Sequence, residues 1–204
     1  IRLIFSSNLS LRWFRDQFAE EEKKKAREKG MDPYEILNEK AEKVPAGSEG
    51  LIFIPHLGGR VCPYNPYIKG SWFGFSWKHT KYHFYRAILE GIAYEYAYYF
   101  SLLNKLSPDI SFKKVRVIGG GARSNLWNQI KSDVLNLSYF KVNREELAVL
   151  GSAIIAGYAV GLFSDLTSTS QRFTSVIHPP INPRLSFYRY YKNFSKLYLN
   201  FLLS

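Results

Sequence analysis

The chain has 204 residues, of which 46% are hydrophobic, and its 28 lysines and arginines outnumber 17 acidic residues to give a net charge of +11. These values fit one globular domain or at most two small ones. They exclude a disordered chain, which would combine low hydrophobicity with high charge. The single cysteine, Cys62, excludes an internal disulfide and any zinc site built from several cysteines.

The start of the chain, IRLIFSSNLS, has too short an apolar stretch for a signal peptide, so we expect a cytoplasmic location. Because the first residue is Ile1 and the only methionine is Met31, we interpret the sequence as a piece of a longer protein. Residues 1–50 carry ten basic and ten acidic side chains, whereas residues 51–204 carry 18 basic and seven acidic ones. This bias suits a phosphate-bearing partner, although a lysine-rich solvated surface explains it equally well.

Helices dominate the first part of the predicted secondary structure. Apolar positions and a dense charge run predict a helix over residues 9–28, which Gly30 ends. Asp32 and Pro33 are a typical cap and first-turn pair, and they predict a second helix that runs to about Lys43.

The middle of the chain combines two short strands with a long helix. Apolar residues predict strands over Leu51–Ile54 and Trp72–Trp77. Between them, the Gly-, Pro- and Tyr-rich stretch His56–Gly70 either lines a ligand or forms an ordered surface loop. Near-helical spacing of apolar and aromatic residues then predicts a long helix over His83–Leu106.

A strand–glycine–helix unit follows. We predict a strand over Lys114–Ile118, a glycine turn over Gly119–Ala122, and a helix that Ser124 caps and that ends near Leu135. Such a turn points backbone N–H groups and a helix dipole at a ligand, which suits phosphate. The motif VIGGGARSN lacks the GxxxxGK[ST] and GxGxxG patterns, so by itself it fits a plain tight turn at least as well as a nucleotide site.

The last part of the chain contains a predicted strand over Tyr139–Val142 and two apolar segments. Residues 147–163 are an uncharged run whose small residues would let a helix pack tightly, and this favours a packed helix over a membrane span. The end of the chain predicts an amphipathic helix whose aromatic stripe docks on the same domain. That stripe consists of Phe187, Tyr191, Phe194, Tyr198 and Phe201.

Residues that could carry catalysis are sparse. His79 and His83 have the spacing of a metal-binding pair, but they straddle the expected start of a helix. Cys62 precedes a proline and has no obvious base, so we expect an inert thiol. Glu90 and Glu95 are five residues apart on one helix and therefore point in different directions. From the residues alone we predict no catalytic and no metal-binding residue.

Several segments, taken in order, resemble the C-terminal lobe of the FGGY family of carbohydrate kinases. SLRWFRD (10–16) is similar to a helix near the start of that lobe, and GSWFGFSWKHTKYHFYRAILEG (70–91) to the second family signature, with Phe75 where a small aliphatic residue is usual. VIGGGARSNLWNQIKSDVLN (117–136) resembles the adenine-nucleotide loop with its helix, and EELAVLGSAIIAG (145–157) the helix that follows. The sequence of residues 70–91 is closer to that of xylulokinase-type than of glycerol-kinase-type members.

The resemblance implies an α/β fold of the actin-like ATPase (ribonuclease H-like) type, a mixed sheet flanked by helices. Residues 1–204 would form the C-terminal nucleotide-binding lobe of a two-lobe sugar kinase, whose N-terminal sugar-binding lobe is absent from this sequence. The family transfers the γ-phosphate of ATP, with Mg²⁺, to a sugar or polyol hydroxyl, and a xylulose-like pentulose is the expected acceptor.

The same resemblance assigns site residues. Gly121 and Asn125 would contact the nucleotide, and Gly119, Gly120 and Ala122 would shape the loop. Asn8 stands where members often have a glycine near the nucleotide.

The expected catalytic base does not occur in the chain. In the family it is an aspartate of a D-N-A-x-G type motif that would precede Ile1, so we expect the chain alone to be inactive. The alternative is a non-catalytic module, derived from a sugar kinase, that binds nucleotide or a partner. A nucleic-acid-binding protein is disfavoured because no known recognition motif occurs. We expect no membrane partner, and the aromatic terminal helix and an exposed lobe–lobe face are compatible with a homodimer.

Overall fold

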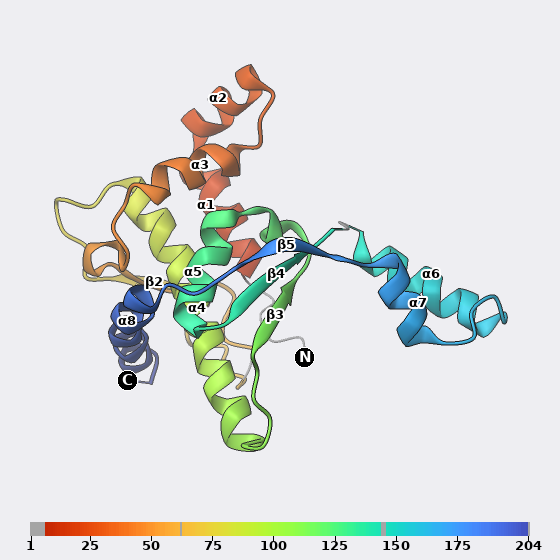
Figure 1. The fold of residues 1–204 in the computed structure, drawn as a ribbon. Coiled ribbons are helices and arrows are strands. Elements are labelled where there is room, and N and C mark those ends of the chain that lie inside the picture. The colour runs from red at the N-terminus through yellow and green to blue at the C-terminus, as the bar shows by residue number, and fades with distance from the viewer. Residues whose placement is uncertain (1–6, 62, 144–145, 204) are drawn as a thin grey trace.

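The computed structural model describes residues 7–61, 63–143 and 146–203 (Figure 1). The helices are α1 (Ser7–Phe18), α2 (Glu20–Lys29), α3 (Pro33–Glu42), α4 (Lys81–Leu106), α5 (Asn125–Leu135), α6 (Leu147–Ala159), α7 (Leu166–Phe173) and α8 (Leu185–Leu203), with 3-10 turns η1 (Ser48–Gly50) and η2 (Gly120–Arg123). The strands are β1 (Ile52–Ile54), β2 (Ser71–Phe73), β3 (Lys114–Val117), β4 (Ser138–Val142) and β5 (Val176–Ile181).

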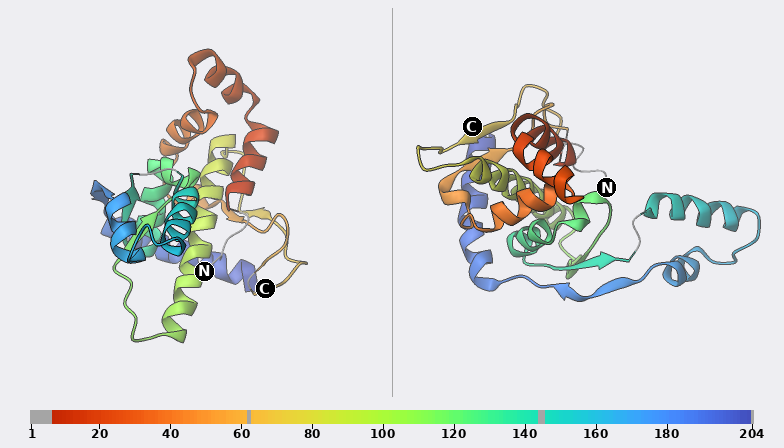
Figure 2. Two further views of the ribbon diagram at one scale, coloured as in Figure 1. Left: turned by 90° about the vertical axis from the view of Figure 1, so that its right-hand side faces the viewer. Right: turned by 90° about the horizontal axis from the view of Figure 1, so that it is seen from above.

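Helix α4 is the centre of the hydrophobic core. It packs against α1, α3, α5, α8 and strand β1, and the views in Figure 2 show these elements gathered around it. Every residue from Tyr85 to Glu95 is buried, so this part of α4 is enclosed on all sides rather than along one apolar stripe. The largest fully buried side chains of the core come from most of these elements: Phe14, Leu37, Phe53, Tyr85, Ile88, Ile92, Tyr94, Ile130, Tyr191 and Tyr198.

The single helix predicted over residues 9–28 is two helices in the structure. Ala19 leaves the helical backbone (φ −114°, ψ 38°) and is fully buried at the break. The change of direction lets Glu22 reach α4, where the Tyr82 hydroxyl donates to it at 2.8 Å and the Lys81 ammonium donates at 3.1 Å. This tertiary contact accounts for the break, which local propensity does not reveal.

The capping predictions of this region are confirmed. Gly30 ends α2 in the left-handed conformation (φ 64°), and the Asp32 carboxylate accepts from the Tyr34 N–H at 2.9 Å before α3 begins at Pro33. These local signals decide the angle between α2 and α3, and so they decide where α3 lies relative to α4.

Two small sheets complete the fold. Strands β1 and β2 pair antiparallel, and β3–β4–β5 form a mixed sheet with β3 parallel and β5 antiparallel to β4. The predicted strand Trp72–Trp77 is too long, because Gly74 turns at φ 81° where an added Cβ would meet the Gly50 carbonyl oxygen at 2.7 Å. β5 and α7 were not predicted. The mixed sheet flanked by helices confirms the expected fold class.

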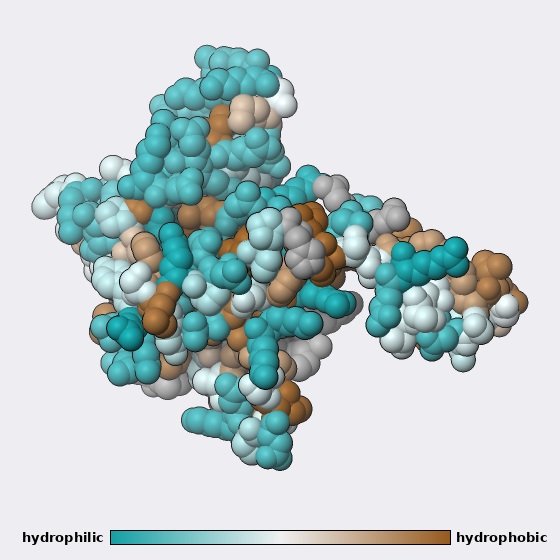
Figure 3. All heavy atoms as spheres, in the orientation of Figure 1, coloured by the Kyte–Doolittle hydropathy of each residue, from teal (hydrophilic) through white to brown (hydrophobic). Residues whose placement is uncertain are grey.

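Helices α6 and α7 form an arm that projects from the body (Figures 1 and 2). The tight packing expected of residues 147–163 is found only in part. Gly157 faces the Phe163 ring closely, but an added Cβ at Gly151 would meet nothing within 4 Å. Figure 3 shows hydrophobic residues on the surface of this arm. Within the described ranges, no helix is long and apolar enough to cross a bilayer.

Two buried polar clusters join α4 to α8. Glu90 accepts from the Gly47 N–H, from Ser48 Oγ and from Arg86 Nε at 2.8–2.9 Å, and Tyr191 donates to it at 3.0 Å. One turn and a half along α4, Glu95 accepts from the Tyr198 hydroxyl and from Arg60. The two carboxylates belong to separate clusters, but both face α8, which differs from the opposed directions that their spacing predicts. Tyr191 and Tyr198 confirm the docking face of α8.

Candidate functional site

The glycine turn between β3 and α5 is built by local geometry. Gly119 adopts φ 77°, a conformation that strongly favours glycine. The 3-10 turn η2 follows, and the Ala122 N–H donates to the Gly119 carbonyl at 3.0 Å. Ser124 then caps α5 by accepting from the Trp127 N–H at 3.1 Å, as predicted. The strand therefore enters the helix through one 3-10 turn rather than directly.

Buried side chains of α5 hold this turn in place. Asn128 is fully buried, and its Nδ2 donates to the Ala122 carbonyl at 2.8 Å. Trp127 Nε1 donates to the Leu89 carbonyl on α4 at 3.0 Å. The turn is thus attached both to its own helix and, through Trp127, to the central helix of the core. Such support fixes the direction of the backbone groups before any ligand arrives.

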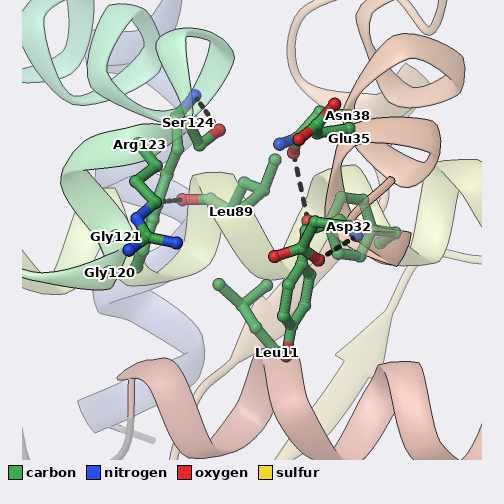
Figure 4. A pocket seen from close by; sticks show the side chains of 12 residues that line it. Leu11, Asp32, Glu35, Asn38, Leu89, Gly120, Gly121, Arg123 and Ser124 are labelled. Atoms are coloured by element: carbon green, nitrogen blue, oxygen red, sulfur yellow. Dashed lines mark hydrogen bonds between the residues drawn. The ribbon is translucent and has the colours of Figure 1, made fainter. Parts of the chain in front are cut away.

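A first hollow of about 380 Å³ lies between the glycine turn and helices α1, α3 and α4 (Figure 4). Its apolar and aromatic lining residues come from α1, α3, α4 and α5. In Figure 4, Gly120, Gly121, Arg123 and Ser124 stand on one side, and Asp32, Glu35 and Asn38 stand on the other. The lining residues are Leu11, Asp32, Tyr34, Glu35, Asn38, Tyr85, Leu89, Gly120, Gly121, Arg123, Ser124 and Trp127.

The polar groups of the first hollow are fixed by neighbours. Tyr85, on α4, donates its hydroxyl to Asn38 Oδ1 at 3.1 Å, and burial raises its pKa above the ordinary range. Burial also raises the pKa of Tyr34, so both rings are neutral at physiological pH. A flat, partly apolar ligand with a few hydrogen-bonding edges fits such a lining.

A second hollow of about 560 Å³ opens on the other side of η2. It lies at the carboxyl ends of the parallel strands β3 and β4, where ligands of α/β sheets commonly bind. Gly120 and Arg123 line both hollows, so the 3-10 turn is the ridge between them. The second hollow is lined by Val117, Ile118, Gly119, Gly120, Ala122, Arg123, Lys141, Val142, Asn143, Glu146, Leu147, Ala148 and Ile177.

The predicted loop residues divide between these hollows. Gly120 and Gly121 line the first, and Gly119, Gly120 and Ala122 line the second. A Cβ added at Gly120 would meet no atom within 4 Å, so a side chain there would extend into the open space of the hollows and would not overlap other protein atoms. Asn125 lines neither hollow; as the first residue of α5, it accepts from Lys141 Nζ at 3.3 Å.

Other predicted residues lie away from the hollows or outside the described residues. His79 precedes the cap Thr80, and His83 Nδ1 lies 3.0 Å from Thr80 Oγ1, so the two histidines flank the helix start as expected. Cys62 lies outside the described residues. Asn8 is in α1, but its side chain lies outside the described part. The described residues contain no group of three His, Cys, Asp or Glu side chains that could hold a metal ion.

Sequence reasoning missed the wall opposite the glycine turn. Tyr34, Glu35 and Asn38 come from the helix predicted after Asp32 and Pro33, and Tyr85 comes from the predicted long helix, and neither helix was expected to line a site. A signal was available for Trp127, which stands two residues after Asn125 in the nucleotide-loop motif. Behind Trp127, the ammonium of Lys131 lies 4.2 Å from the ring centroid, and burial lowers the pKa of Lys131 to about 7.

Comparison with known proteins places the chain in a family. Residues 3–160 match the model of the FGGY family of carbohydrate kinases, C-terminal domain. Gluconokinase of Bacillus subtilis (strain 168) is 35% identical over 187 residues, 90% of this chain and 36% of that protein. Xylulose kinase of Staphylococcus epidermidis (strain ATCC 12228) is 32% identical over 197 residues, 95% of this chain and 37% of that protein.

Solved structures agree on the fold. The xylulose kinase from Rhodospirillum rubrum superposes with a TM-score of 0.75 at 24% identity, over 95% of this chain and 37% of that one. The gluconate kinase from Lactobacillus acidophilus gives a TM-score of 0.74 with the same identity and coverage. This chain therefore spans little more than a third of the length of the relatives it matches. The chain belongs to the FGGY family of carbohydrate kinases, corresponds to its C-terminal domain, and has the actin-like ATPase fold of these kinases.

Proposed function

We propose that residues 1–204 form the nucleotide-binding lobe of a kinase that uses MgATP to phosphorylate a hydroxyl of a sugar or polyol. The observation that carries the proposal is the first hollow, in which a braced glycine turn faces an aromatic and apolar wall. Its size and lining suit a purine with its ribose. The match to the family's C-terminal domain supports the same proposal.

In this proposal the loop residues have distinct roles. Gly120 and Gly121 both line the hollow and let the nucleotide approach the backbone, and at Gly120 a side chain would extend into open space. Gly119 and Ala122 set the course of the turn, and Asn125 contributes an amide near its end. Bound MgATP would supply the transferable phosphoryl group, and the residues of this chain would bind and orient it.

Under the same proposal, the isolated chain is inactive. Phosphoryl transfer to a hydroxyl needs a group that accepts the hydroxyl proton beside the phosphate. Asp32 and Glu35, the carboxylates at the first hollow, lie on the wall proposed to contact the purine, not beside the transferred phosphate. No D-N-A-x-G motif, which would supply the catalytic base, occurs in the sequence. An N-terminal lobe would supply this group and most contacts to the acceptor.

The acceptor is proposed from two signals. The sequence of residues 70–91 favours a xylulose-like pentulose as the acceptor, whereas the similarity to a 35% identical gluconokinase favours gluconate. Both are polyhydroxylated acyclic or open-chain molecules with a primary hydroxyl. Steady-state assays of the longer kinase with xylulose and gluconate would rank the two, and the better acceptor should have the higher kcat/KM.

Calorimetric titration of the chain with MgADP tests nucleotide binding. We expect saturable binding to the wild type and at least about tenfold weaker binding to Gly120→Val, because its side chain enters the hollow. Gly58→Val is the matched control: its Cβ would also meet no atom within 4 Å, but it lies in the β1–β2 loop. Equal affinity in Gly120→Val and wild type would refute the assignment of the hollow.

A phosphorylation assay separates the enzyme lobe from the alternative, a non-catalytic binding module. The isolated chain should not transfer phosphate from MgATP to xylulose or gluconate, and turnover at enzymic rates would overturn its proposed dependence on another lobe. Joining the chain to a family N-terminal lobe should restore turnover if it is an enzyme lobe. Nucleotide binding without restored turnover would favour the module.

A further inference from the structure

The loop between β2 and α4, residues 74–80, carries two aromatic side chains that face solvent. Trp77 is fully exposed and Phe75 is 66% exposed. The loop projects from the side of the body (Figures 1 and 2). Phe75 also stands where the FGGY resemblance leads us to expect a small aliphatic residue. Aromatic rings grouped at a surface typically mark an interaction site, and the proposed function uses neither of these two.

Two histidines hold this loop in place. The Ser76 N–H donates to His79 Nδ1 at 2.8 Å, and the Thr80 N–H donates to His83 Nδ1 at 3.1 Å. The two imidazole rings also meet edge to face, with their centroids 5.4 Å apart. Because Nδ1 accepts from the backbone, Nε2 carries the proton of each neutral ring and is not free to bind a metal. The pair instead fixes the direction in which the loop presents its aromatic side chains.

The exposed loop is one end of a continuous row of aromatic rings. Phe75 contacts Phe84 on α4 with ring centroids 6.1 Å apart, and Phe84 contacts Trp72 on β2 at 5.6 Å. Trp72 in turn contacts Trp13 on α1 at 6.0 Å, and Trp13 contacts Phe18 at 5.4 Å. The three central rings are half-buried, whereas Phe18 at the far end is exposed. We call this row, together with Trp77, the aromatic strip.

Charges of both signs lie beside the aromatic strip. The Lys78 ammonium is 3.7 Å from a Glu49 oxygen, and the Lys81 ammonium is 3.2 Å from a Glu21 oxygen. All four side chains are at least partly exposed, so these pairs balance the charge here, in a chain with a net charge of +11. Nucleic acids and anionic membranes attract an excess of positive charge, whereas a surface with both signs can complement a copy of itself.

We propose that the aromatic strip is the interface through which two copies of this chain form a two-fold dimer, with Trp77 as its anchor. In a two-fold interface the same patch meets itself, so a lysine of one copy can face a glutamate of the other. Burial of the exposed rings supplies the driving force. The aromatic terminal helix is less suited to this role, because Tyr191 and Tyr198 are buried in the body. The proposal does not depend on the nucleotide site.

Sedimentation velocity over a series of protein concentrations tests the proposal. We expect a reversible monomer–dimer equilibrium in the wild type and at least about tenfold weaker dimerisation in Trp77→Ser, because an aromatic anchor is lost. Trp77→Phe should keep most of the affinity. Val160→Ser is the matched control: Val160 is apolar and exposed but lies at the end of α6, and its loss should change nothing. Thermal melting confirms that each variant is folded.

A charge exchange tests whether the strip meets a copy of itself. Lys78→Glu makes the surroundings of the strip negative and Glu21→Lys makes them positive, so like charges face each other in a dimer of either variant. Each variant alone should dimerise more weakly than the wild type. An equal mixture of the two should dimerise more tightly than either alone, because opposite charges then meet.

Three results would overturn the proposal. A wild type that stays monomeric into the high micromolar range would remove the dimer. A dimer that survives Trp77→Ser, or that is lost in Val160→Ser, would place the interface elsewhere. Pelleting with phosphatidylserine vesicles gives the third: binding of monomeric wild type that Trp77→Ser abolishes would assign the strip to a lipid surface.

Discussion

The body of the molecule and the α6–α7 arm bury their apolar residues to very different degrees. In the body, α4 and α8 enclose carboxylates and tyrosines that are almost completely buried, with Glu90 and Glu95 each 1% exposed. In the arm, Val149 is 66% and Ile155 is 63% exposed, although α6 is the more apolar helix. Burial here follows position in the fold rather than hydrophobicity of the segment.

This difference in burial shows that the body supports the candidate site, whereas the α6–α7 arm only lies near it. The lining of the first hollow comes from α1, α3, α4 and the turn before α5, all packed in the body. The arm packs mainly on itself and contributes only the start of α6 to the second hollow. We therefore expect the body to unfold as one cooperative unit and the arm to open at lower cost.

The largest effect should follow loss of Arg86. It donates to Glu90, to the Ala41 carbonyl and to Tyr191, so Arg86→Met leaves a buried carboxylate without its cation. We expect a loss of roughly 3–5 kcal/mol in the free energy of unfolding, measured by urea denaturation. Ile155→Ser on the arm is the comparison, and it should change this value by less than about 0.5 kcal/mol. Similar losses of unfolding free energy in both variants would contradict the distinction between a cooperative body and a weakly packed arm.

The next effect is steric. Gly91, inside α4, faces the backbone of β1, and an added Cβ would overlap the Phe53 carbonyl oxygen. Gly91→Ala should cost about 1–3 kcal/mol or more, because neither helix nor strand can move without disturbing the core. The urea midpoint of this variant should therefore fall clearly below that of the wild type. An unchanged midpoint would mean that β1 can move away from α4.

The third prediction concerns pH. Burial lowers the pKa of Lys131 from 10.5 to about 7. Between these values the unfolded chain binds a proton that the folded chain does not, so the wild type should lose stability as pH falls from about 10 to 7 and lose no more below that. Lys131→Met should remove this dependence and stabilise the chain by roughly 1–2 kcal/mol at pH 7.

Urea titrations of both proteins at pH 7, 8 and 9 check this third prediction. Lys113→Met, which removes an exposed lysine, is the control and should keep the wild-type slope. Parallel pH profiles for wild type and Lys131→Met would show that Lys131 is not desolvated.

The smallest effect should have the opposite sign to that of Gly91→Ala. Gly151 lies inside α6, and a Cβ there would meet nothing within 4 Å. Gly151→Ala should stabilise the arm by about 0.5–1 kcal/mol through helix propensity alone. Hydrogen exchange of the α6 amides would report this as slower exchange, with the body amides unchanged. Faster exchange in α6 would mean that Gly151 is packed against a neighbour.

Local sequence signals gave the parts of the fold that depend on a few neighbouring residues. Gly30, Asp32 and Ser124 end or cap helices as predicted, because the backbone conformations they favour are set within one turn. The break at Ala19 and the wall formed by Tyr34 and Asn38 escaped prediction. Both depend on α4, which is distant in sequence, and no local pattern specifies which helix faces will meet.

The candidate site divides in the same way. The glycine turn was visible as a strand–glycine–helix pattern, and the resemblance added a nucleotide to it. The opposite wall became visible only when α3 and α4 were in place, with Tyr85 donating to Asn38 across the two helices. The second hollow needed the pairing of Val117 with Lys141, which joins residues 24 positions apart.

A crystal structure of the chain grown with MgADP would test the proposed site most directly. The nucleotide base should lie in the first hollow, between the glycine turn and the wall of α3 and α4. Nucleotide density elsewhere would contradict the proposed site.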